Sequence, residues 1–192
     1  MSPPGPRAVL VRHAETEWTL SGQHTGRTDL PLTERGRGVA RALAPRLAGY
    51  DFSLVLVSPL LRARETCELS GLADRAEERE DLREWDYGDY EGLTSPQIEE
   101  RRPGWDLWRD GCPGGEDAAA VGARAERIVA ELAAATGPVA VFSHGHALRV
   151  LGACWAELGP AEGARLGLST ASISELGHEH DTRILVRWNT SA

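Results

Sequence analysis

Three short apolar runs in this chain each end at a polar cluster, and this repeated feature restricts the fold more than any other. The runs are AVLVR at 8–12, SLVLV at 53–57 and PVAVF at 138–142. Continuous apolar runs of this length are typical of strands that are buried on both faces of a parallel sheet. Longer amphipathic stretches alternate with them. The pattern therefore predicts a three-layer α/β/α fold, in which a mainly parallel central sheet lies between helices.

Helix boundaries follow from capping residues, prolines and glycines. After the run at 53–57, Ser58 is expected as the N-cap of a helix, with Pro59 at its first position and Gly71 as its stop. Pro45 is expected to interrupt the preceding helix. The other expected elements are a helix over 33–48, a short strand near 81–83, a helix opened by Thr94 or Ser95, an ordered surface loop over 101–117, a helix over about 116–135, a helix directly after 142, and strands near 170–176 and 183–188.

Length and composition fit one globular domain over residues 1–192, with a flexible segment at 1–6. The chain has 192 residues, of which 41% are hydrophobic and 26% are charged. A chain of this length can bury a core without a disulfide or a structural metal. The three cysteines are an odd number and have no C-x-x-C spacing, which predicts reduced thiols at Cys67, Cys112 and Cys154. Reduced thiols and the lack of a secretory signal pattern predict a cytoplasmic location.

Net charge argues against two classes of partner. The formal charge is -8, whereas nucleic acid and anionic membranes both attract a concentrated positive surface. No apolar run approaches the ~20 residues that cross a bilayer. All 21 basic residues are arginine, so the chain offers no lysine for a Schiff base or for a phosphate-binding loop. A small molecule is the expected partner, and a homodimer is an assembly that the sequence leaves open.

Arginine or histidine follows each of the three apolar runs. Arg12 and His13 lie at the end of the first, Arg62 lies in the helix after the second, and His144 follows the third. The carboxyl ends of parallel strands form the ligand crevice of an open α/β sheet. A histidine at such an end can simply bind a loop backbone, but a buried arginine beside it requires an anion or a carboxylate. A helix that begins after His144 would present free N–H groups to an anion.

Two histidine pairs offer an alternative, a metal site. His144 and His146 form one pair, and His178 and His180 form the other. Neither pair has an acidic or cysteine ligand at a recognisable metal-binding spacing. No metal is therefore expected, and His178 and His180 are interpreted as solvated turn residues.

Four segments resemble one known family in their order and in their positions after the strands. They are LVRHAETEW, SPLLRARET, LREWDYGDYEG and SHGHALR, and they extend from Val9 to at least Arg149. The family is the histidine phosphatase superfamily, also called the phosphoglycerate mutase-like family. The EWDYGDYEG and SHGH segments look most like its small acid-phosphatase branch. The resemblance implies a phosphoglycerate mutase-like fold and a reaction that needs neither a metal ion nor another cofactor.

The resemblance also implies roles for five residues. His13 would attack phosphorus and form a phosphohistidine intermediate, for which an accessible neutral imidazole nitrogen is needed. Arg12, Arg62 and His144 would surround the transferred phosphoryl group as three cationic groups. Glu84 would donate a proton to the leaving oxygen. It would then activate water as a carboxylate. The role of proton donor requires that Glu84 is partly buried.

Contacts to the rest of the substrate are expected from a second set of residues. The resemblance places Gln23, Thr25 and Gly26 in a segment that contacts phosphate or substrate in relatives. Gly145 could offer its backbone N–H to the same ligand. These four residues are the predicted substrate-binding set.

Several neighbouring residues are interpreted as structural. Arg64 lies two positions from Arg62 on the expected helix, so it faces elsewhere and is assigned to an ion pair or a cap. Trp105 and Trp108 could form a lid over the substrate or pack the loop down, and packing is favoured. Three acidic residues of the EWDYGDYEG segment are interpreted as solvated: Asp86, Asp89 and Glu91.

A phosphatase and a mutase share phosphohistidine chemistry, so peripheral residues must separate them. Mutases of the family have a longer insertion between the acid and the second histidine, and an Asn-rich segment after the first. Here sixty positions separate Glu84 from His144, and TEWTLSGQHTG contains no Asn. We therefore predict a phosphomonoester hydrolase of the histidine acid phosphatase type that acts on small phosphorylated metabolites. The alternatives are a cofactor-dependent phosphoglycerate mutase and a phospho-ligand binding module without turnover.

Overall fold

A six-stranded sheet forms the centre of the computed structural model, which describes residues 7–191. Parallel pairing joins β1 to β4, β4 to β2 and β2 to β3, whereas β5 runs antiparallel to both β1 and β6. The expectation of a mainly parallel sheet is confirmed, and the expectation for residues 1–6 lies outside the described residues. In spatial order the strands are β3 (Ala76–Glu78), β2 (Leu54–Val57), β4 (Val139–Ser143), β1 (Ala8–Arg12), β5 (Ile173–Glu179) and β6 (Thr182–Thr190).

The two central strands, β1 and β4, are buried on both faces because their side chains alternate between two hydrophobic cores. Along β1, Val9 and Val11 belong to one core and Leu10 belongs to the other. Along β4, Val141 and Phe142 are divided in the same way. A strand that is covered on both sides therefore needs a continuous apolar run in the sequence.

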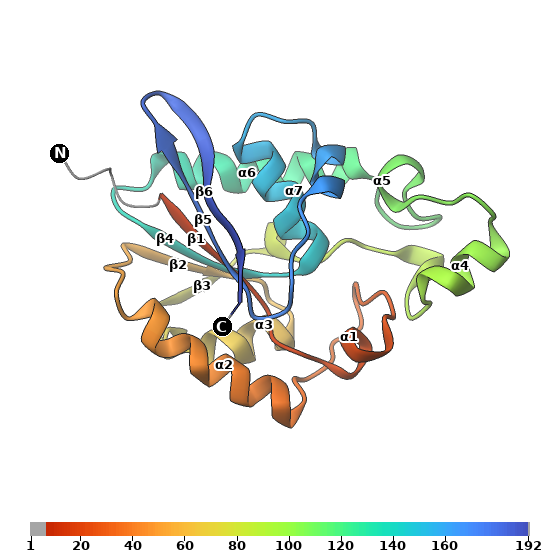
Figure 1. The fold of residues 1–192 in the computed structure, drawn as a ribbon, viewed down its shortest axis with the longest axis horizontal. Helices are drawn as coiled ribbons and strands as arrows, with labels where there is room; N and C mark the ends of the chain where they lie inside the picture. The colour runs from red at the N-terminus through yellow and green to blue at the C-terminus, as the bar shows by residue number, and fades with distance from the viewer. Residues whose placement is uncertain (1–6, 192) are drawn as a thin grey trace.

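Two pairs of helices cover the two faces of the sheet, which completes the three layers (Figure 1). α2 (Glu34–Leu47) and α3 (Leu61–Leu69) pack on the core that contains Val9 and Val11. α6 (Ala118–Ala134) and α7 (Gly145–Trp155) pack on the core that contains Leu10. The expectations of helices over 33–48, 116–135 and directly after 142 are confirmed.

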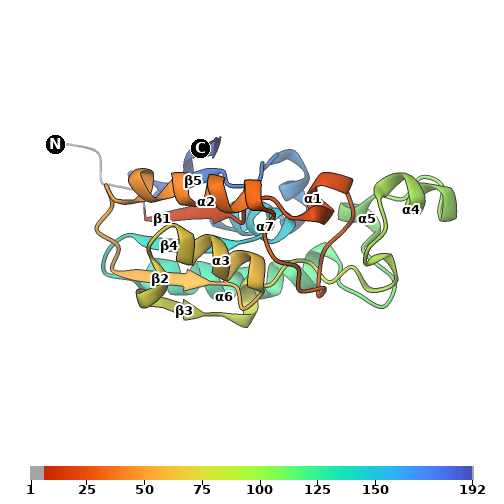
Figure 2. The same ribbon diagram turned by 90° about the horizontal axis from the view of Figure 1, so that it is seen from below.

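Short helices gather at one end of the sheet, beyond the carboxyl ends of β1, β2 and β4 (Figures 1 and 2). They are α1 (Glu17–Ser21), α4 (Ser95–Arg101) and α5 (Leu107–Asp110). Single turns of 3-10 helix connect other elements: η1 (Ala73–Arg75), η2 (Glu80–Leu82), η3 (Gly88–Tyr90) and the longer η4 (Pro160–Arg165). Within residues 7–191 no helix combines the length and apolarity that a membrane span needs.

The start of α3 differs from the expectation that Ser58 caps it. The helix begins at Leu61, and its N-cap is Leu60, which makes no side-chain capping bond. The Ser58 hydroxyl instead lies 2.7 Å from Nε2 of His144. Ser58 is therefore used by the functional site rather than by the helix, which is why the capping interpretation was wrong.

Two further local expectations were also wrong. Pro45 does not interrupt α2, because it lies in the last turn and the helix continues to Leu47. Residues 80–82 form η2, and the short strand of this region is β3, several positions earlier. By contrast, Gly71 lies just after the end of α3 at a φ of 83°, so its interpretation as a helix stop is confirmed.

The three cysteines are free thiols, as expected. Cys67, Cys112 and Cys154 are all buried and none forms a disulfide. Burial raises the pKa of each thiol to about 12, so each is a neutral, unreactive group near neutral pH.

Candidate active site

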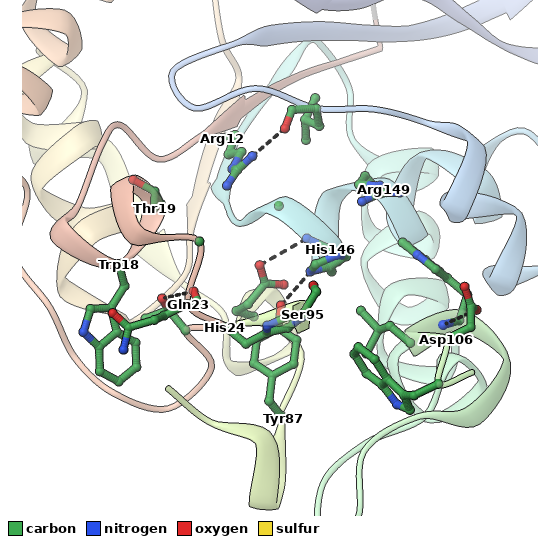
Figure 3. A pocket seen from close by; sticks show the side chains of 18 of the residues that line it. Arg12, Trp18, Thr19, Gln23, His24, Tyr87, Ser95, Asp106, His146 and Arg149 are labelled. Atoms are coloured by element: carbon green, nitrogen blue, oxygen red, sulfur yellow. Dashed lines mark hydrogen bonds between the residues drawn. The ribbon is translucent and has the colours of Figure 1, made fainter. Parts of the chain in front are cut away.

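A cavity of about 670 Å³ opens where β1 and β4 end, beneath the short helices. Arg12, His13 and Glu84 line its inner part, and the fully buried Arg62 and His144 do not line it. These five residues are here called the phosphoryl end. Its outer part, here called the outer end, is walled by His24, Tyr87, Trp105, Trp108, His146 and Arg149. Figure 3 shows both parts, with Arg12 on one side of His146 and Arg149 on the other.

His13 follows directly from β1 and is held in one orientation. Its backbone N–H donates to the carbonyl of Ser143 at 2.9 Å, which fixes it beside the end of β4. Its ring Nδ1 lies 2.8 Å from the carbonyl of Ala14, and because a carbonyl can only accept, Nδ1 carries the proton. Burial, Arg62 and Arg12 lower the pKa of His13 well below its usual 6.5. The ring is therefore neutral near pH 7, and Nε2 presents a free lone pair.

Two buried arginines flank His13, and the backbone holds each of them. Arg12, the last residue of β1, donates from Nη1 to the carbonyl of Leu168. Arg62, in the first turn of α3, donates to the carbonyls of Thr25 and Thr28, both at 3.0 Å. In both side chains Nε is buried and has no hydrogen-bond partner.

His144, the N-cap of α7, lies beside His13 with ring centroids 5.1 Å apart. The Ser58 hydroxyl accepts the N–H of Leu60 and can donate to Nε2 of His144, which leaves Nδ1 as the protonated nitrogen. Burial, followed by the charge of Arg62, lowers the pKa of His144 well below its usual value. The direction of this pKa shift favours a neutral donor beside two cations. The expectation that His144 is a third cation beside a dianionic phosphoryl group stays a prediction.

The unpartnered atoms of the site have no equivalent elsewhere in residues 7–191. Arg12 Nε, Arg62 Nε and His144 Nδ1 are the buried side-chain nitrogen or oxygen atoms that lack a hydrogen-bond partner there. A buried polar group without a partner costs about 1–3 kcal/mol. An anion that offers several oxygen atoms, as a phosphoryl group does, would satisfy donors of this kind.

Glu84 is held against the N-terminus of α7. Its Oε1 accepts the N–H groups of Trp85 and Ala147, both at 2.9 Å, and its Oε2 accepts the N–H of His146 at 3.1 Å. Glu84 lines the same cavity as His13 and is 8% exposed, so it can exchange a proton with a bound ligand without being fully solvated.

Arg124 and Glu116 position the Glu84 loop, and the sequence analysis did not find them. Arg124, from α6, is buried and donates from Nη1 to the carbonyls of Asp81 and Arg83, at 2.8 and 2.7 Å. Its Nε donates to Glu116, whose other oxygen accepts the N–H of Asp86. The pair therefore fixes the backbone on both sides of Glu84. No local signal marks Arg124, since its carbonyl partners lie 41 and 43 positions earlier.

The predicted substrate-binding residues do not all reach the cavity. Gln23, Thr25 and Gly145 line it, but Gly26 does not. The Gly26 carbonyl accepts a hydrogen bond from Arg62 at 3.1 Å, so Gly26 orders an active-site arginine instead. At Gly145 a Cβ would lie 3.2 Å from Cζ of Arg12, so this glycine lets the guanidinium approach the start of α7.

The interpretation of Glu91 as a solvated acid was wrong. Its carboxylate accepts the N–H of Gly26 at 2.9 Å and that of Thr28 at 3.0 Å. These bonds order the segment whose carbonyls receive Arg62. Asp86 is also engaged, through a 2.6 Å ion pair with the exposed Arg27, whereas the side chain of Asp89 makes no hydrogen bond within residues 7–191.

The outer end is a cluster of aromatic rings and histidines. The hydroxyl of Tyr87 lies 2.6 Å from Nδ1 of His146. His146 packs edge-to-face against Trp108, with centroids 5.5 Å apart. Trp105 packs against His24 at 5.8 Å and donates from its indole to the carbonyl of Gly111. Both tryptophans therefore pack the 101–117 loop, as favoured above, and also line the cavity.

Other residues singled out from the sequence lie away from the site. Arg64 pairs with Glu78 at 3.5 Å, as expected of an ion-pair residue. His178 and His180 are exposed near the turn between β5 and β6. Within residues 7–191 no three His, Cys, Asp or Glu side chains are grouped so as to hold a metal ion.

Known proteins are similar to this chain in sequence and in fold. The family model described as the histidine phosphatase superfamily (branch 1) matches residues 8–191. An acid phosphatase of Mycobacterium tuberculosis is 44% identical over 93% of this chain and 90% of its own length. A 2,3-bisphosphoglycerate-dependent phosphoglycerate mutase of Methylobacterium radiotolerans is 38% identical over 74% of this chain and 76% of its own.

A solved structure agrees with the same assignment. It is a mycobacterial glucosyl-3-phosphoglycerate phosphatase in complex with VO3, with a TM-score of 0.85 and 32% identity, covering 96% of this chain and 98% of its own. The chain described here belongs to the histidine phosphatase superfamily, which confirms the resemblance seen in its sequence. It is a phosphatase of that superfamily.

Proposed function

We propose that the protein is a metal-independent phosphomonoester hydrolase that transfers a phosphoryl group first to His13 and then to water. The observation that carries this proposal is the set of three buried, unpartnered donors beside a neutral histidine. The cavity of about 670 Å³ has room for small phosphorylated metabolites. Acid phosphatase and glucosyl-3-phosphoglycerate phosphatase relatives support a phosphate ester as the substrate.

In the first step, the Nε2 lone pair of His13 attacks phosphorus and forms a P–N bond. The ester P–O bond breaks, and its electron pair leaves with the alcohol oxygen, which takes a proton from Glu84. Arg12 Nε, Arg62 Nε and His144 Nδ1 donate to the oxygens of the phosphoryl group. Each such preorganised donor contributes about 3 kcal/mol to lowering the barrier.

In the second step, Glu84 is a carboxylate and accepts a proton from water as the water oxygen attacks phosphorus. The P–N bond breaks and returns its electron pair to Nε2 of His13. Inorganic phosphate and the neutral histidine result, so the site is ready for another cycle. Arg124 and Glu116 keep the Glu84 loop in place for both proton transfers.

Metal independence is supported by the donors already present. Arg12 and Arg62 supply two positive charges, and His144 with the Ser58 hydroxyl supplies a neutral N–H. Planar guanidinium groups suit the oxygens of phosphate. These groups supply the charge stabilisation for which many phosphoryl-transfer enzymes use a metal ion.

The cellular setting that we propose is cytoplasmic, with a small molecule as the substrate. The three free thiols support a reducing compartment. A net charge of -8 supports the absence of nucleic acid and anionic membranes among the partners. A homodimer stays a prediction. Measurement of the native mass in solution tests it.

A phosphoglycerate mutase is the second candidate, and the 38% identical mutase relative is the observation that favours it. The two functions differ only in the acceptor of the phosphoryl group, which is water or the hydroxyl of a second phosphoglycerate. Phosphate release and bisphosphoglycerate-dependent isomerisation of 3-phosphoglycerate should therefore be measured on one preparation. Isomerisation faster than phosphate release would overturn the hydrolase proposal.

The direct test is phosphate release from p-nitrophenyl phosphate in excess EDTA, at about pH 5.5 and about pH 7.5. The wild-type protein is expected to turn over under both conditions, and His13→Ala is expected to lose about 10⁴-fold or more in kcat. His178→Ala, at the exposed end of β5, is the control and should keep wild-type activity. Tight phosphate binding without turnover by the wild type would instead identify a binding module.

A further inference from the structure

We propose that Asn189, on β6 at one edge of the sheet, is a positioning residue for Arg12 and therefore for the binding of the phosphoryl group. This inference rests on the proposed function, because the proposed function assigns Arg12 to the phosphoryl group. It adds a residue near the end of the chain to the support of a site whose residues follow other strands.

The side chain of Arg12 is held by one segment, residues 167–172 between η4 and β5, here called the Arg12 loop. Nη1 of Arg12 donates to the carbonyl of Leu168, and this is the one hydrogen bond of the guanidinium within the described part of the chain. The loop also touches the main chain beside it, since the N–H of Ala171 donates to the carbonyls of Arg12 and His13, at 3.1 and 3.2 Å. A displacement of the Arg12 loop would therefore displace the guanidinium.

Two consecutive side chains of β6 hold the Arg12 loop in place. Trp188 donates from its indole to the carbonyl of Gly167 at 2.7 Å. The side-chain oxygen of Asn189 accepts the N–H of Ser169, also at 2.7 Å. An N–H can only donate, so the oxygen of the Asn189 amide, and not its nitrogen, faces Ser169. The loop is therefore fixed to β6 at two points, one on each side of Leu168.

Asn189 and Arg12 bind the same peptide group. The carbonyl of Leu168 and the N–H of Ser169 belong to one peptide unit, which is planar, so the two groups point in opposite directions. Arg12 donates to the carbonyl, and Asn189 accepts the N–H. Hydrogen bonds that are linked through one such group also strengthen one another. Asn189 therefore fixes the direction of the carbonyl and, through it, the plane in which Nε of Arg12 donates to a ligand.

The backbone of β6 is adapted to aim Asn189 at the loop. Between the pair formed by Ile173 and Thr190 and the pair formed by Glu175 and Arg187, β6 contains one residue more than β5. An extra residue of this kind is a β-bulge, which turns a side chain out of the regular alternation. Asn189 lies in this bulge with a φ of 57°, a left-handed conformation that asparagine adopts more readily than most residues. The bond to Ser169 gives this unusual conformation a purpose.

The test separates the amide of Asn189 from its backbone conformation. Asn189→Gly removes the acceptor oxygen but suits a positive φ, whereas Asn189→Asp keeps an acceptor oxygen and also tolerates this conformation. His180→Gly is the matched control, because His180 has a φ of 53° and lies exposed at the turn between β5 and β6. kcat/KM is measured from phosphate release on p-nitrophenyl phosphate and on glycerol 3-phosphate, and each variant is also melted thermally.

Asn189→Gly is expected to lower kcat/KM by about fivefold on both esters, the effect of one lost hydrogen bond. Asn189→Asp should recover most of that loss, and His180→Gly should keep wild-type activity. Both glycine variants should melt close to the wild type. An unchanged kcat/KM in Asn189→Gly would overturn the proposal, as would equal losses in Asn189→Gly and Asn189→Asp.

A second background shows whether Asn189 acts through Arg12. Arg12→Met alone is expected to lower kcat/KM by about 100-fold. Asn189→Gly should then cause no further loss, because the group that it positions is already absent. A residue that only supports the fold would give the same factor in both backgrounds, since effects of independent sites add. A further fivefold loss in Arg12→Met/Asn189→Gly would therefore contradict the positioning role.

A binding measurement separates this inference from the proposed function. The dissociation constant of inorganic phosphate is measured by calorimetry for the wild type, Asn189→Gly, Arg12→Met and the double variant. Weaker binding in Asn189→Gly that disappears in the Arg12→Met background supports the positioning of Arg12, even if the wild type releases no phosphate from any ester. Absence of release would then contradict only the hydrolase proposal. Equal phosphate affinities of the wild type and Asn189→Gly would overturn the inference, even in an active hydrolase.

Discussion

The two ends of the cavity are built from different parts of the fold. At the phosphoryl end, Arg62 and His144 are fully buried and His13 is 3% exposed. These residues follow β1, β2 and β4 directly or lie in the first turn of a helix. At the outer end, Trp105 and Trp108 lie in and beside a four-residue helix and are partly exposed. The group that every substrate shares meets strand ends and helix starts, whereas the part that varies meets α7 on one side and loops on the other.

The difference shows how one chain can combine demanding chemistry with an adjustable specificity. The three unpartnered donors are held by strand ends and by backbone carbonyls, so their positions do not depend on the leaving group. Positioning of this kind is what phosphoryl transfer requires. Loop residues at the outer end can change without disturbing the sheet. Substitutions of the residues that contact the phosphoryl group should therefore affect all substrates alike. Substitution of the proton donor Glu84 should follow the leaving group, and substitutions at the outer end should affect substrates differently.

The largest effect in this comparison is expected for Glu84→Gln, and it should depend on the leaving group. Removal of a general acid costs about 10²–10⁴-fold when the leaving oxygen must be protonated. We expect a loss of about 10³-fold on an alkyl phosphate such as glycerol 3-phosphate, and a much smaller loss in the first step on p-nitrophenyl phosphate. Single-turnover release of the alcohol or phenol measures that step. Equal losses on both esters would contradict the role of Glu84 as proton donor.

Arg62→Met should lower kcat/KM by a similar factor on every phosphate ester. Loss of one preorganised donor costs about 3 kcal/mol, or roughly two orders of magnitude in rate. Arg62→Lys keeps the charge but loses the planar group, so it should recover only part of the rate. Thermal melts would show whether the carbonyls of Thr25 and Thr28 tolerate the change. A loss confined to one class of substrate would break the proposed division between the two ends.

Tyr87→Phe should have a smaller effect that varies among substrates. The change removes the donor to Nδ1 of His146 and so releases the ring from one tautomer. Loss of a hydrogen bond of this kind costs about 1 kcal/mol, or about fivefold in kcat/KM. The loss should be greater for polyol phosphates than for p-nitrophenyl phosphate. Tyr90→Phe, which removes a hydroxyl from a neighbouring buried ring, is the control.

The smallest expected effect is the change in activity when mild acid titrates His13. Burial, Arg62 and Arg12 hold the pKa of His13 well below 6.5, so the neutral nucleophile persists as the pH falls through that value. A histidine with its usual pKa would lose activity by about tenfold per pH unit below it. We expect kcat/KM for p-nitrophenyl phosphate to change by less than about threefold between pH 7 and pH 5.5. A tenfold fall over this interval would show that the core does not depress the pKa of this histidine.

The phosphoryl end could be predicted from the sequence because it is local to the strands. Arg12, His13 and His144 directly continue buried apolar runs, and parallel strands bring their carboxyl ends together. Arg124, Glu91 and Arg149 could not be found in this way. In the sequence each of them looks like a solvated charged residue, because its partners lie 8 to 65 positions away along the chain. Only the packed structure shows that burial and backbone carbonyls turn such residues into parts of a site.

The central claim is that the phosphoryl group passes through His13 on its way to water. The stereochemistry at phosphorus tests it most directly, with an isotopically chiral phosphorothioate ester hydrolysed by the wild-type enzyme in water enriched in heavy oxygen. Two successive in-line displacements, to His13 and then to water, predict net retention of configuration in the inorganic thiophosphate. Net inversion would show a single direct attack by water and would contradict the account.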